Sequence, residues 1–295
     1  MSSTETTTEV TAGGKRFRIS EKIQKYGDLI TKHTYKLSGD RGDCVSIIIN
    51  YCNHVPVDGS FIFSDYDYTC RLGTVVNRGI GSILMIKTLL RYIHSKYPSV
   101  TKFTFTDMSN IECIIDHIQP SDDDSHIIPL PLNLLSIAYN GKTWYEHYFN
   151  AEYTDPDRQK KYREKIQFLY NPEEKLNFLR FLEVASPPIE QTDYLKDKYI
   201  SASTYHEFFN SIPKNDRCLI LRPWLRSFMW HYLDNIFSYN TWVIDIRNMN
   251  RNQHKKRKLQ KKGKGKRNTP YYIPKGVIVH YTTYEHCQRY NKLGM

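Results

Sequence analysis

LGTVVNRGIGSILMIKTLLRYIHSKYPSVTKFTFTD, residues 72–107, is the stretch that decides the fold. It opens with a short β-branched run, Leu72–Val76, and a glycine-containing turn follows. From Ile80 the apolar residues recur at helical spacing until Pro98 stops the helix. Residues 102–107 then alternate between polar and aromatic side chains, as a half-buried strand does. The stretch therefore predicts a strand, a turn, an amphipathic helix and a second strand.

The turn before the predicted helix has the composition of an anion site. Gly79 and Gly81 can take a positive φ without steric cost, and the free N–H groups and dipole of a helix start attract anions. The stretch lacks the third glycine of the dinucleotide fingerprint, and no Gly-Lys-Ser/Thr follows as in a P-loop. A plain tight turn is the alternative interpretation.

This order of elements resembles the GNAT family of acyl-CoA N-acyltransferases over about residues 40–155. In that family a strand leads into a basic-Gly-x-Gly loop and a helix, and the next strand ends near an Asn. The resemblance implies a GNAT-like mixed sheet with flanking helices and acetyl-CoA as the cofactor. One position departs from the pattern, because Val76 stands where the family usually has Gln or Arg. The residues implied to hold the cofactor are Val76, Arg78, Gly79, Ile80, Gly81, Ser82 and Asn110.

The resemblance also implies an acetyl-CoA-dependent N-acetyltransferase, in which a deprotonated amine attacks the thioester directly. In the family a Tyr on a late helix can protonate the leaving thiolate, and Tyr145 occupies a similar segment. That segment is one residue short and lacks the family's Gly. His117 is a competing candidate, and Asp107 or Glu112 could serve as the base. The alternative role for Tyr145 is structural, as a buried side chain packed beside its aromatic neighbours.

A second, shorter resemblance concerns the segment GKTWYE, residues 141–146. It is similar to segments of predicted proteins from large nucleocytoplasmic DNA viruses. The similarity implies a viral protein, with other viral proteins as partners and the host cytoplasm, nucleus or virion as its location.

Composition narrows the class of protein. With 295 residues, 40% hydrophobic and 25% charged, the chain is typical of a globular protein. It has no apolar run of about 18 residues, and its first residues have no signal-peptide pattern, so neither a membrane span nor secretion is expected. The six cysteines form no C-x-x-C pair, which favours reduced thiols in an intracellular, reducing compartment. The histidines show no metal-ligand spacing, so no metal is expected.

The net charge of +11 comes from one segment, residues 251–267. This basic segment has ten Lys or Arg and no acid, and the rest of the chain has 32 basic and 31 acidic residues. Such a segment predicts binding to nucleic acid or another polyanion through phosphates, although a solvated loop is the alternative. The alternative function is thus a non-catalytic nucleic-acid-associated or virion structural protein. The candidate nucleic-acid-binding residues are Arg251, Lys255, Lys256, Arg257, Lys258, Lys261, Lys262, Lys264, Lys266 and Arg267.

The predicted fold class is α/β (α+β), in four parts. Residues 1–17 are expected to be a flexible tail, because their Ser, Thr, Glu and Gly residues bury little. Residues 18–155 form the GNAT-like domain, 156–237 a helical region, and 238–295 two strands flanking the basic segment. Within the domain, residues 15–37 could be a short helix or a strand, 44–52 a buried strand and 55–59 a turn.

Overall fold

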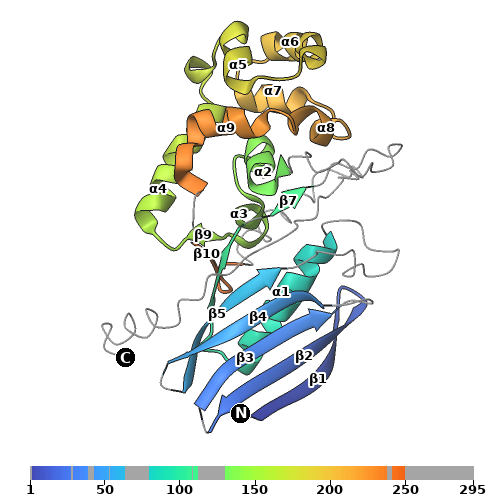
Figure 1. The fold of residues 1–295 in the computed structure, drawn as a ribbon, viewed down its shortest axis with the longest axis vertical. Coiled ribbons are helices and arrows are strands. Elements are labelled where there is room, and N and C mark those ends of the chain that lie inside the picture. The colour runs from blue at the N-terminus through green and yellow to red at the C-terminus, as the bar shows by residue number, and fades with distance from the viewer. Residues whose placement is uncertain are drawn as a thin grey trace, which may run out of the picture. The chain divides into compact units, whose positions relative to one another are not determined.

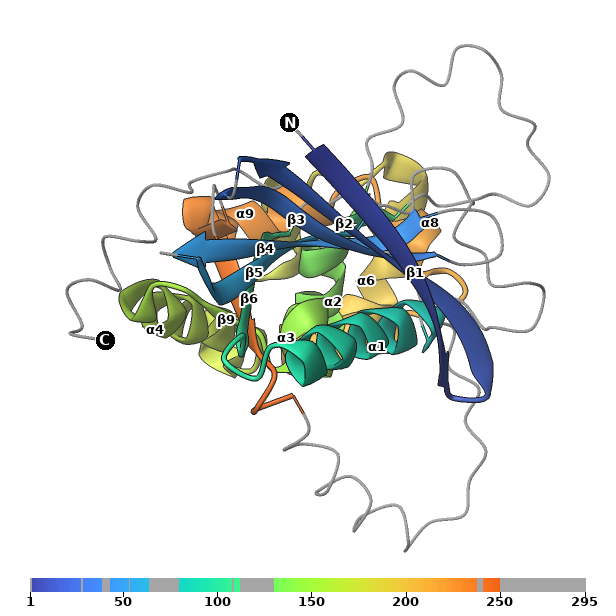
Figure 2. The same cartoon turned by 90° about the horizontal axis from the view of Figure 1, so that it is seen from below.

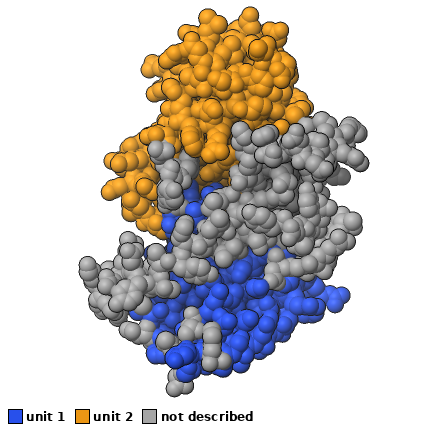
Figure 3. All heavy atoms as spheres, in the orientation of Figure 1, with its two compact units in different colours: residues 1–108, 148–152, 241–295 blue, residues 109–147, 153–240 orange. Residues whose placement is uncertain are grey.

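The computed structural model describes residues 2–27, 29–38, 43–52, 54–63, 80–107, 109–111, 130–237 and 241–249 (Figure 1). The chain divides into two compact units, which Figure 3 colours separately. Unit 1 comprises residues 1–108, 148–152 and 241–295, and unit 2 comprises residues 109–147 and 153–240. The division differs from the predicted boundary at residue 155, because the helical unit already begins at residue 109.

Unit 1 is built on a mixed sheet whose eight strands follow the order β1-β2-β3-β4-β5-β6-β10-β9. The strands β1 to β5 form an antiparallel meander, β6 pairs parallel with β5, and β10 pairs antiparallel with β6. This sheet and its helices confirm the predicted mixed α/β class. The bounds of the strands are β1 Ser2–Ala12, β2 Lys15–Tyr26, β3 Leu29–Ser38, β4 Asp43–Cys52, β5 Val55–Phe63, β6 Lys102–Thr106, β9 Glu152–Tyr153 and β10 Thr241–Asp245.

The first two strands form a hairpin with a two-residue turn. Ala12 pairs with Lys15, and the intervening Gly13 and Gly14 have φ values of +57° and +73°. Two consecutive positive φ values are those of a type I′ turn, whose twist matches that of the strands it joins. Glycine is needed here because other residues adopt this conformation only with strain.

The structure thus has strand β1 where the sequence predicts a flexible tail. Its side chains bury little, but its threonines are β-branched and favour extended backbone. In addition, Glu5 lies opposite Lys22 and Glu9 opposite Arg18 on β2, and such cross-strand pairs of opposite charge stabilise a sheet. Pairing with a neighbouring strand, rather than burial, therefore orders these residues.

Strand β5 occupies the residues for which the sequence predicts a turn. Val55 already pairs with Cys52 of β4, and His54 beside this pair has φ +65°. The turn predicted over residues 55–59 is therefore wrong, because these residues belong to β5. The predicted strand over residues 44–52 is confirmed, and residues 15–37 form two strands rather than a helix.

Helix α1, Ile80–Lys96, confirms the predicted amphipathic helix and covers one face of the sheet (Figure 2). It joins β5 to β6, so the three elements form a parallel crossover. The strand predicted at Leu72–Val76 lies outside the described residues, and the strand paired with β6 is β5. The buried apolar side chains in the described part of α1 are Met85, Ile86, Leu89, Leu90 and Ile93, each at most 3% exposed.

Unit 2 consists mainly of helices and includes a two-stranded sheet of β7, Asn110–Ile111, and β8, Leu130–Pro131. None of the described helices is long and apolar enough to cross a membrane. The helices are α2 Leu132–Asn140, α3 Trp144–Phe149, which ends within unit 1, α4 Pro156–Lys165, α5 Phe178–Ala185, α6 Thr192–Ser201, α7 Tyr205–Ser211, α8 Arg217–Leu221 and α9 Leu225–Leu233. Short 3₁₀ helices occupy Ile166–Leu169, Pro172–Glu174, Ile189–Gln191 and Asp234–Phe237.

Aromatic rings form the core of unit 2. Phe181 of α5 lies 5.4 Å from Trp224 and 5.6 Å from Phe228 of α9, measured between ring centroids, and all three side chains are fully buried. The helical character predicted for residues 156–237 is confirmed. Thr204 caps α7, because its Oγ1 accepts a hydrogen bond from the Glu207 amide.

The cysteines differ from the prediction. Cys44 and Cys218 are each disulfide-bonded, and Cys52 is a buried free thiol. The prediction of reduced thiols is therefore wrong for two of the six cysteines. The predicted reducing compartment, which rested on reduced thiols, loses that support.

The parallel pair at the centre of the sheet requires a glycine. A Cβ at Gly59 of β5 would lie 2.6 Å from the Phe103 ring and 3.2 Å from Ile47. We expect Gly59→Ala to lower the free energy of unfolding by about 1–3 kcal/mol, because the ring must move within a packed core. Denaturant unfolding of Gly59→Ala, Phe103→Leu and the double variant tests this, and the double variant should lose less than the sum of the two. Unchanged stability in Gly59→Ala would contradict the packing described.

Candidate functional site

The predicted cofactor residues are only partly brought together. Ile80, Gly81 and Ser82 are the first three residues of α1 in unit 1. Asn110 lies in β7, which belongs to unit 2. Three predicted residues, Val76, Arg78 and Gly79, lie outside the described residues, as do His117, Glu112 and the whole basic segment.

The start of α1 lies at a defined edge of the sheet. Because β5 and β6 are parallel and α1 returns the chain between them, the N-terminus of α1 lies at the carboxyl ends of both strands. Ligands of open α/β sheets bind at this edge. The first turn of α1 contains no acidic side chain that would repel an anion.

The described pairing of the two parallel strands stops before this edge. They pair at Gly59–Phe103 and Ser60–Thr104, whereas β5 continues to Phe63 and β6 to Thr106. On their outer sides both strands remain paired to these ends, with β4 and β10 respectively. The backbone groups that face each other beyond residues 60 and 104 are therefore not used in a β5–β6 ladder.

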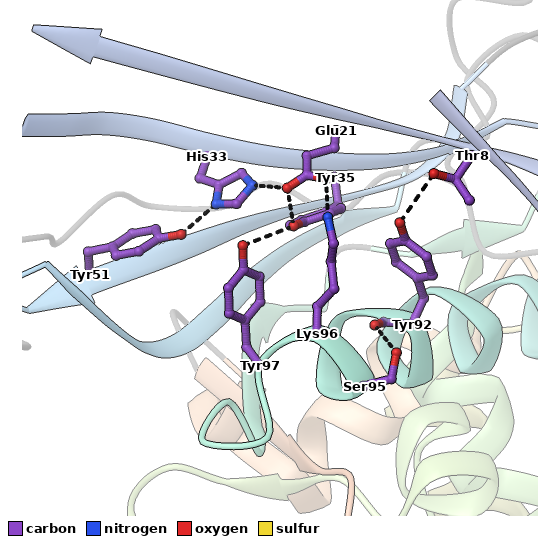
Figure 4. Close-up of polar contacts among 9 residues, drawn as sticks. All are labelled: Thr8, Glu21, His33, Tyr35, Tyr51, Tyr92, Ser95, Lys96 and Tyr97. Carbon is purple, nitrogen blue, oxygen red and sulfur yellow. Dashed lines mark hydrogen bonds and ion pairs between the residues drawn. The ribbon is translucent and has the colours of Figure 1, made fainter. Parts of the chain in front are cut away.

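A polar network lies on the face of the sheet that α1 covers (Figure 4). Its centre is Glu21 of β2, whose side chain is 12% exposed. One Glu21 carboxylate oxygen accepts hydrogen bonds from His33 Nε2, at 2.9 Å, and from the Tyr35 hydroxyl, at 2.5 Å. The other oxygen forms an ion pair with Lys96, the last residue of α1.

The network continues from His33 to β4. Because His33 Nε2 donates to Glu21, Nδ1 is the acceptor, and the Tyr51 hydroxyl donates to it at 2.5 Å. On the other side, the Tyr35 hydroxyl lies 3.3 Å from that of Tyr97. Three strands and the end of α1 are thus joined by one set of hydrogen bonds (Figure 4).

Burial and hydrogen bonding set the protonation states of the network. Burial lowers the pKa of His33, and this outweighs the opposite effect of Glu21, so the imidazole is neutral. Burial alone would raise the pKa of Glu21, but hydrogen bonds from Lys96, Tyr35 and His33 lower it, so the carboxyl is ionised. Burial, together with Glu21 and Tyr97, raises the pKa values of Tyr35 and Tyr51. The network therefore contains a carboxylate, an ammonium and neutral imidazole and phenol groups.

The network is separate from the predicted anion site. Lys96 and Ile80 are the two ends of α1, about 24 Å apart at 1.5 Å per residue. The strand register also separates the two sites. Neighbouring strands pair in one row through His33, Ile49, Gly59 and Phe103, and this row lies before the carboxyl ends of β5 and β6. The network therefore anchors the C-terminal end of α1 to β2, β3 and β4. The sequence did not lead us to predict this network. The alternation of His33, Tyr35 and Leu37 along β3 was the signal that could have indicated a buried polar side chain there.

Tyr145, the candidate general acid, lies in α3 of unit 2 and is 1% exposed. Its ring lies edge-on to Trp144, with 4.9 Å between centroids. A buried side chain packed in this way is the structural alternative that the sequence leaves open. The burial does not support proton transfer from Tyr145 to a leaving group.

The surrounding segment GKTWYE has a local structural explanation. Gly141, with φ +59°, ends α2, and a Cβ there would lie 2.1 Å from the Tyr170 hydroxyl oxygen. Thr143 Oγ1 accepts from the Glu146 amide at 3.2 Å, while Glu146 Oε2 accepts from the Thr143 amide at 3.0 Å, which is a capping box. Burial raises the pKa of Glu146, although Tyr162 donates a hydrogen bond to its carboxyl group.

Among the described residues, no group of three or more His, Cys, Asp or Glu side chains could hold a metal ion. No known protein family, curated protein or solved structure matches the chain. The resemblance to the GNAT family therefore remains a prediction from the order of sequence elements.

We expect the network to make stability depend on pH. His33 is held neutral in the folded protein, so its contribution is complete above the ordinary His pKa of about 6.5 and is lost as pH falls through the lowered value. Glu21 acts in the same direction at lower pH, below the ordinary Glu value of about 4.3. Wherever one extra proton separates the unfolded from the folded state, the free energy of unfolding should fall by about 1.4 kcal/mol per pH unit.

The variant His33→Gln tests this because an amide can still donate to Glu21 and accept from Tyr51, yet it does not titrate. Between pH 7 and pH 5 (about the His range), its unfolding free energy should fall less than that of the parent protein. His231→Gln on the exposed face of α9 is the control and should follow the parent. Identical pH profiles for the parent and His33→Gln would show that His33 takes no part.

Proposed function

We propose that unit 1 binds an acyl-coenzyme A at the carboxyl edge of β5 and β6, and that the protein is a GNAT-like N-acyltransferase. The observation that carries the proposal is the parallel β5–α1–β6 crossover, which directs the start of α1 toward the open ends of both strands. This is the arrangement that the family resemblance leads us to expect.

The start of α1 suits the pyrophosphate of coenzyme A. The first four N–H groups of a helix have no partner inside the helix, and the dipole adds about half a positive charge. No acidic residue of the first turn opposes this charge. Arg78, which precedes the turn glycine in the sequence, would pair with a phosphate oxygen in the same arrangement.

The carboxyl edge of β5 and β6 suits the rest of the ligand. The arm that joins the coenzyme A phosphates to the thiol contains two amides, which need backbone partners when they leave water. In this proposal the arm lies along the ends of β5 and β6, beyond the Gly59–Phe103 and Ser60–Thr104 pairs. An extended arm can pair there as an added strand does.

The reaction would be direct acyl transfer. The nitrogen of the substrate amine attacks the thioester carbonyl carbon, the C–N bond forms, the C–S bond breaks, and the thiolate leaves and takes up a proton. Asp107, which follows β6 at the carboxyl edge, is the residue to which we assign acceptance of the amine proton. Because Tyr145 is buried, we assign it a packing role, and solvent can supply the proton for the thiolate.

Thermal unfolding in the presence of acetyl-CoA tests the proposal. A ligand at about 100 times its Kd adds about 2.7 kcal/mol to the free energy of unfolding, so Tm should rise. Gly81→Asp should abolish the rise, because its carboxylate would stand where the pyrophosphate binds. Ser95→Asp is the matched control, since it places the same charge in the last turn of α1 and should keep the rise. An unchanged Tm of the parent at millimolar acetyl-CoA would refute acyl-CoA binding.

A second function rests on a separate observation, the ten Lys and Arg in residues 251–267. These residues lie outside the described part of the chain, so the sequence alone supports this proposal. We propose that the segment binds nucleic acid through phosphate contacts, with little preference among base sequences. The two functions are compatible, because they use different residues.

Salt dependence of DNA binding tests the second function. If about six charges engage phosphates, a plot of log K against log salt should have a slope near −5 for duplex DNA. Replacing the ten Lys and Arg by Gln should abolish binding, whereas replacing the seven Lys by Arg should preserve it. Binding that survives the Gln replacement would place the contact elsewhere on the chain.

A further inference from the structure

Strand β1 lies at one end of the sheet and pairs with β2 along its whole length, Ser2–Ala12. Within the described residues no strand pairs with its other side, and every residue from Ser2 to Glu9 is exposed. Proteins usually protect such an edge with proline, lysine, a bulge or a short strand. β1 is 11 residues long, contains no Pro or Lys, and pairs with β2 without a register shift, and its two charged side chains, Glu5 and Glu9, lie opposite Lys22 and Arg18 of β2.

The hairpin turn determines which backbone groups face outward. In a two-residue hairpin the flanking residues, here Ala12 and Lys15, exchange both backbone hydrogen bonds. From this pair onward, hydrogen-bonded and non-hydrogen-bonded pairs alternate along the hairpin. The backbone groups of the even-numbered residues of β1 therefore bond to β2. The odd-numbered residues direct their N–H and C=O groups to the free edge, and these are Ser3, Glu5, Thr7, Glu9 and Thr11.

We propose that this edge pairs antiparallel with β1 of a second copy of the chain, so that a two-fold axis joins two sheets into one. Identical edges can pair in this way because an antiparallel contact is self-complementary. The inference is independent of acyl-CoA and of nucleic-acid binding, since it uses only β1.

The side chains of β1 permit such a contact in defined registers. A two-fold axis at Thr7 would place Glu5 opposite Glu9 of the other copy, and like charges directly opposite destabilise a sheet. An axis at Thr6 or Thr8 avoids this, because each Glu then faces Ser or Thr. Both registers keep the outward-facing odd residues opposite one another, as the ladder requires. The Glu charges are, moreover, already opposite Lys22 and Arg18 on β2.

Sedimentation velocity over a range of micromolar concentrations tests the proposal on the full chain. The parent should shift from the 34.9 kDa monomer to a dimer as concentration rises. Thr7→Pro removes an outward N–H without removing a β1–β2 hydrogen bond, so it should keep the Tm and remain monomeric. Thr7→Val keeps the N–H and the β-branch and should still dimerise.

Amide hydrogen exchange of the parent gives a second readout that needs no variant. The outward amides of Glu5, Thr7 and Glu9 should gain protection as concentration rises, while those of Thr4, Thr6 and Thr8 should be protected at every concentration. A parent that stays monomeric, a dimer that persists in Thr7→Pro, or odd amides whose exchange is independent of concentration would each overturn the proposal.

Discussion

The carboxylate of Glu21 connects helix α1 to the sheet of unit 1. Burying a charge is costly unless several donors replace its water, and Glu21 has three: Lys96 at the end of α1, and His33 and Tyr35 on β3. Glu21 and Tyr35 are also paired across β2 and β3, so the same group favours one strand register. A shift by one residue would turn Glu21 to the other face and leave these donors unpaired.

The two ends of helix α1 have different structural surroundings. Its C-terminal end is fixed by the Glu21 network, whereas its N-terminal end lies at the carboxyl ends of β5 and β6. Gly59 allows the Phe103 ring to pack against β5, and the described β5–β6 pairs are Gly59–Phe103 and Ser60–Thr104. A helix held firmly at one end can present its free N–H groups at the other in a constant position, which is what binding an anionic ligand requires.

Side chains that suggest catalysis in the sequence have structural roles in unit 2. Tyr145 is buried against Trp144, and Glu146 closes a capping box with Thr143. The short similarity over GKTWYE thus coincides with a helix end and a helix start, which explains why Gly, Thr and Glu occur at this spacing. Stabilisation of these two helix ends is sufficient to explain the residues of this segment, and a catalytic role is not needed to explain them.

The sequence by itself determined the elements whose signal is local. The apolar spacing from Ile80 to Ile93, the stop at Pro98 and the alternation around Phe103 and Phe105 give α1 and β6, because each depends on neighbours within a few residues. The same holds for the Thr204 cap of α7. β1 shows the limit of such reasoning, since its polar residues suggest disorder until β2 is placed beside them. Only the tertiary structure decided that β5 is the parallel partner of β6, that Glu21, His33, Tyr35 and Lys96 meet, and that Tyr145 is buried. These contacts join residues up to 75 positions apart, and their energies depend on strand register and helix docking, which no single segment encodes.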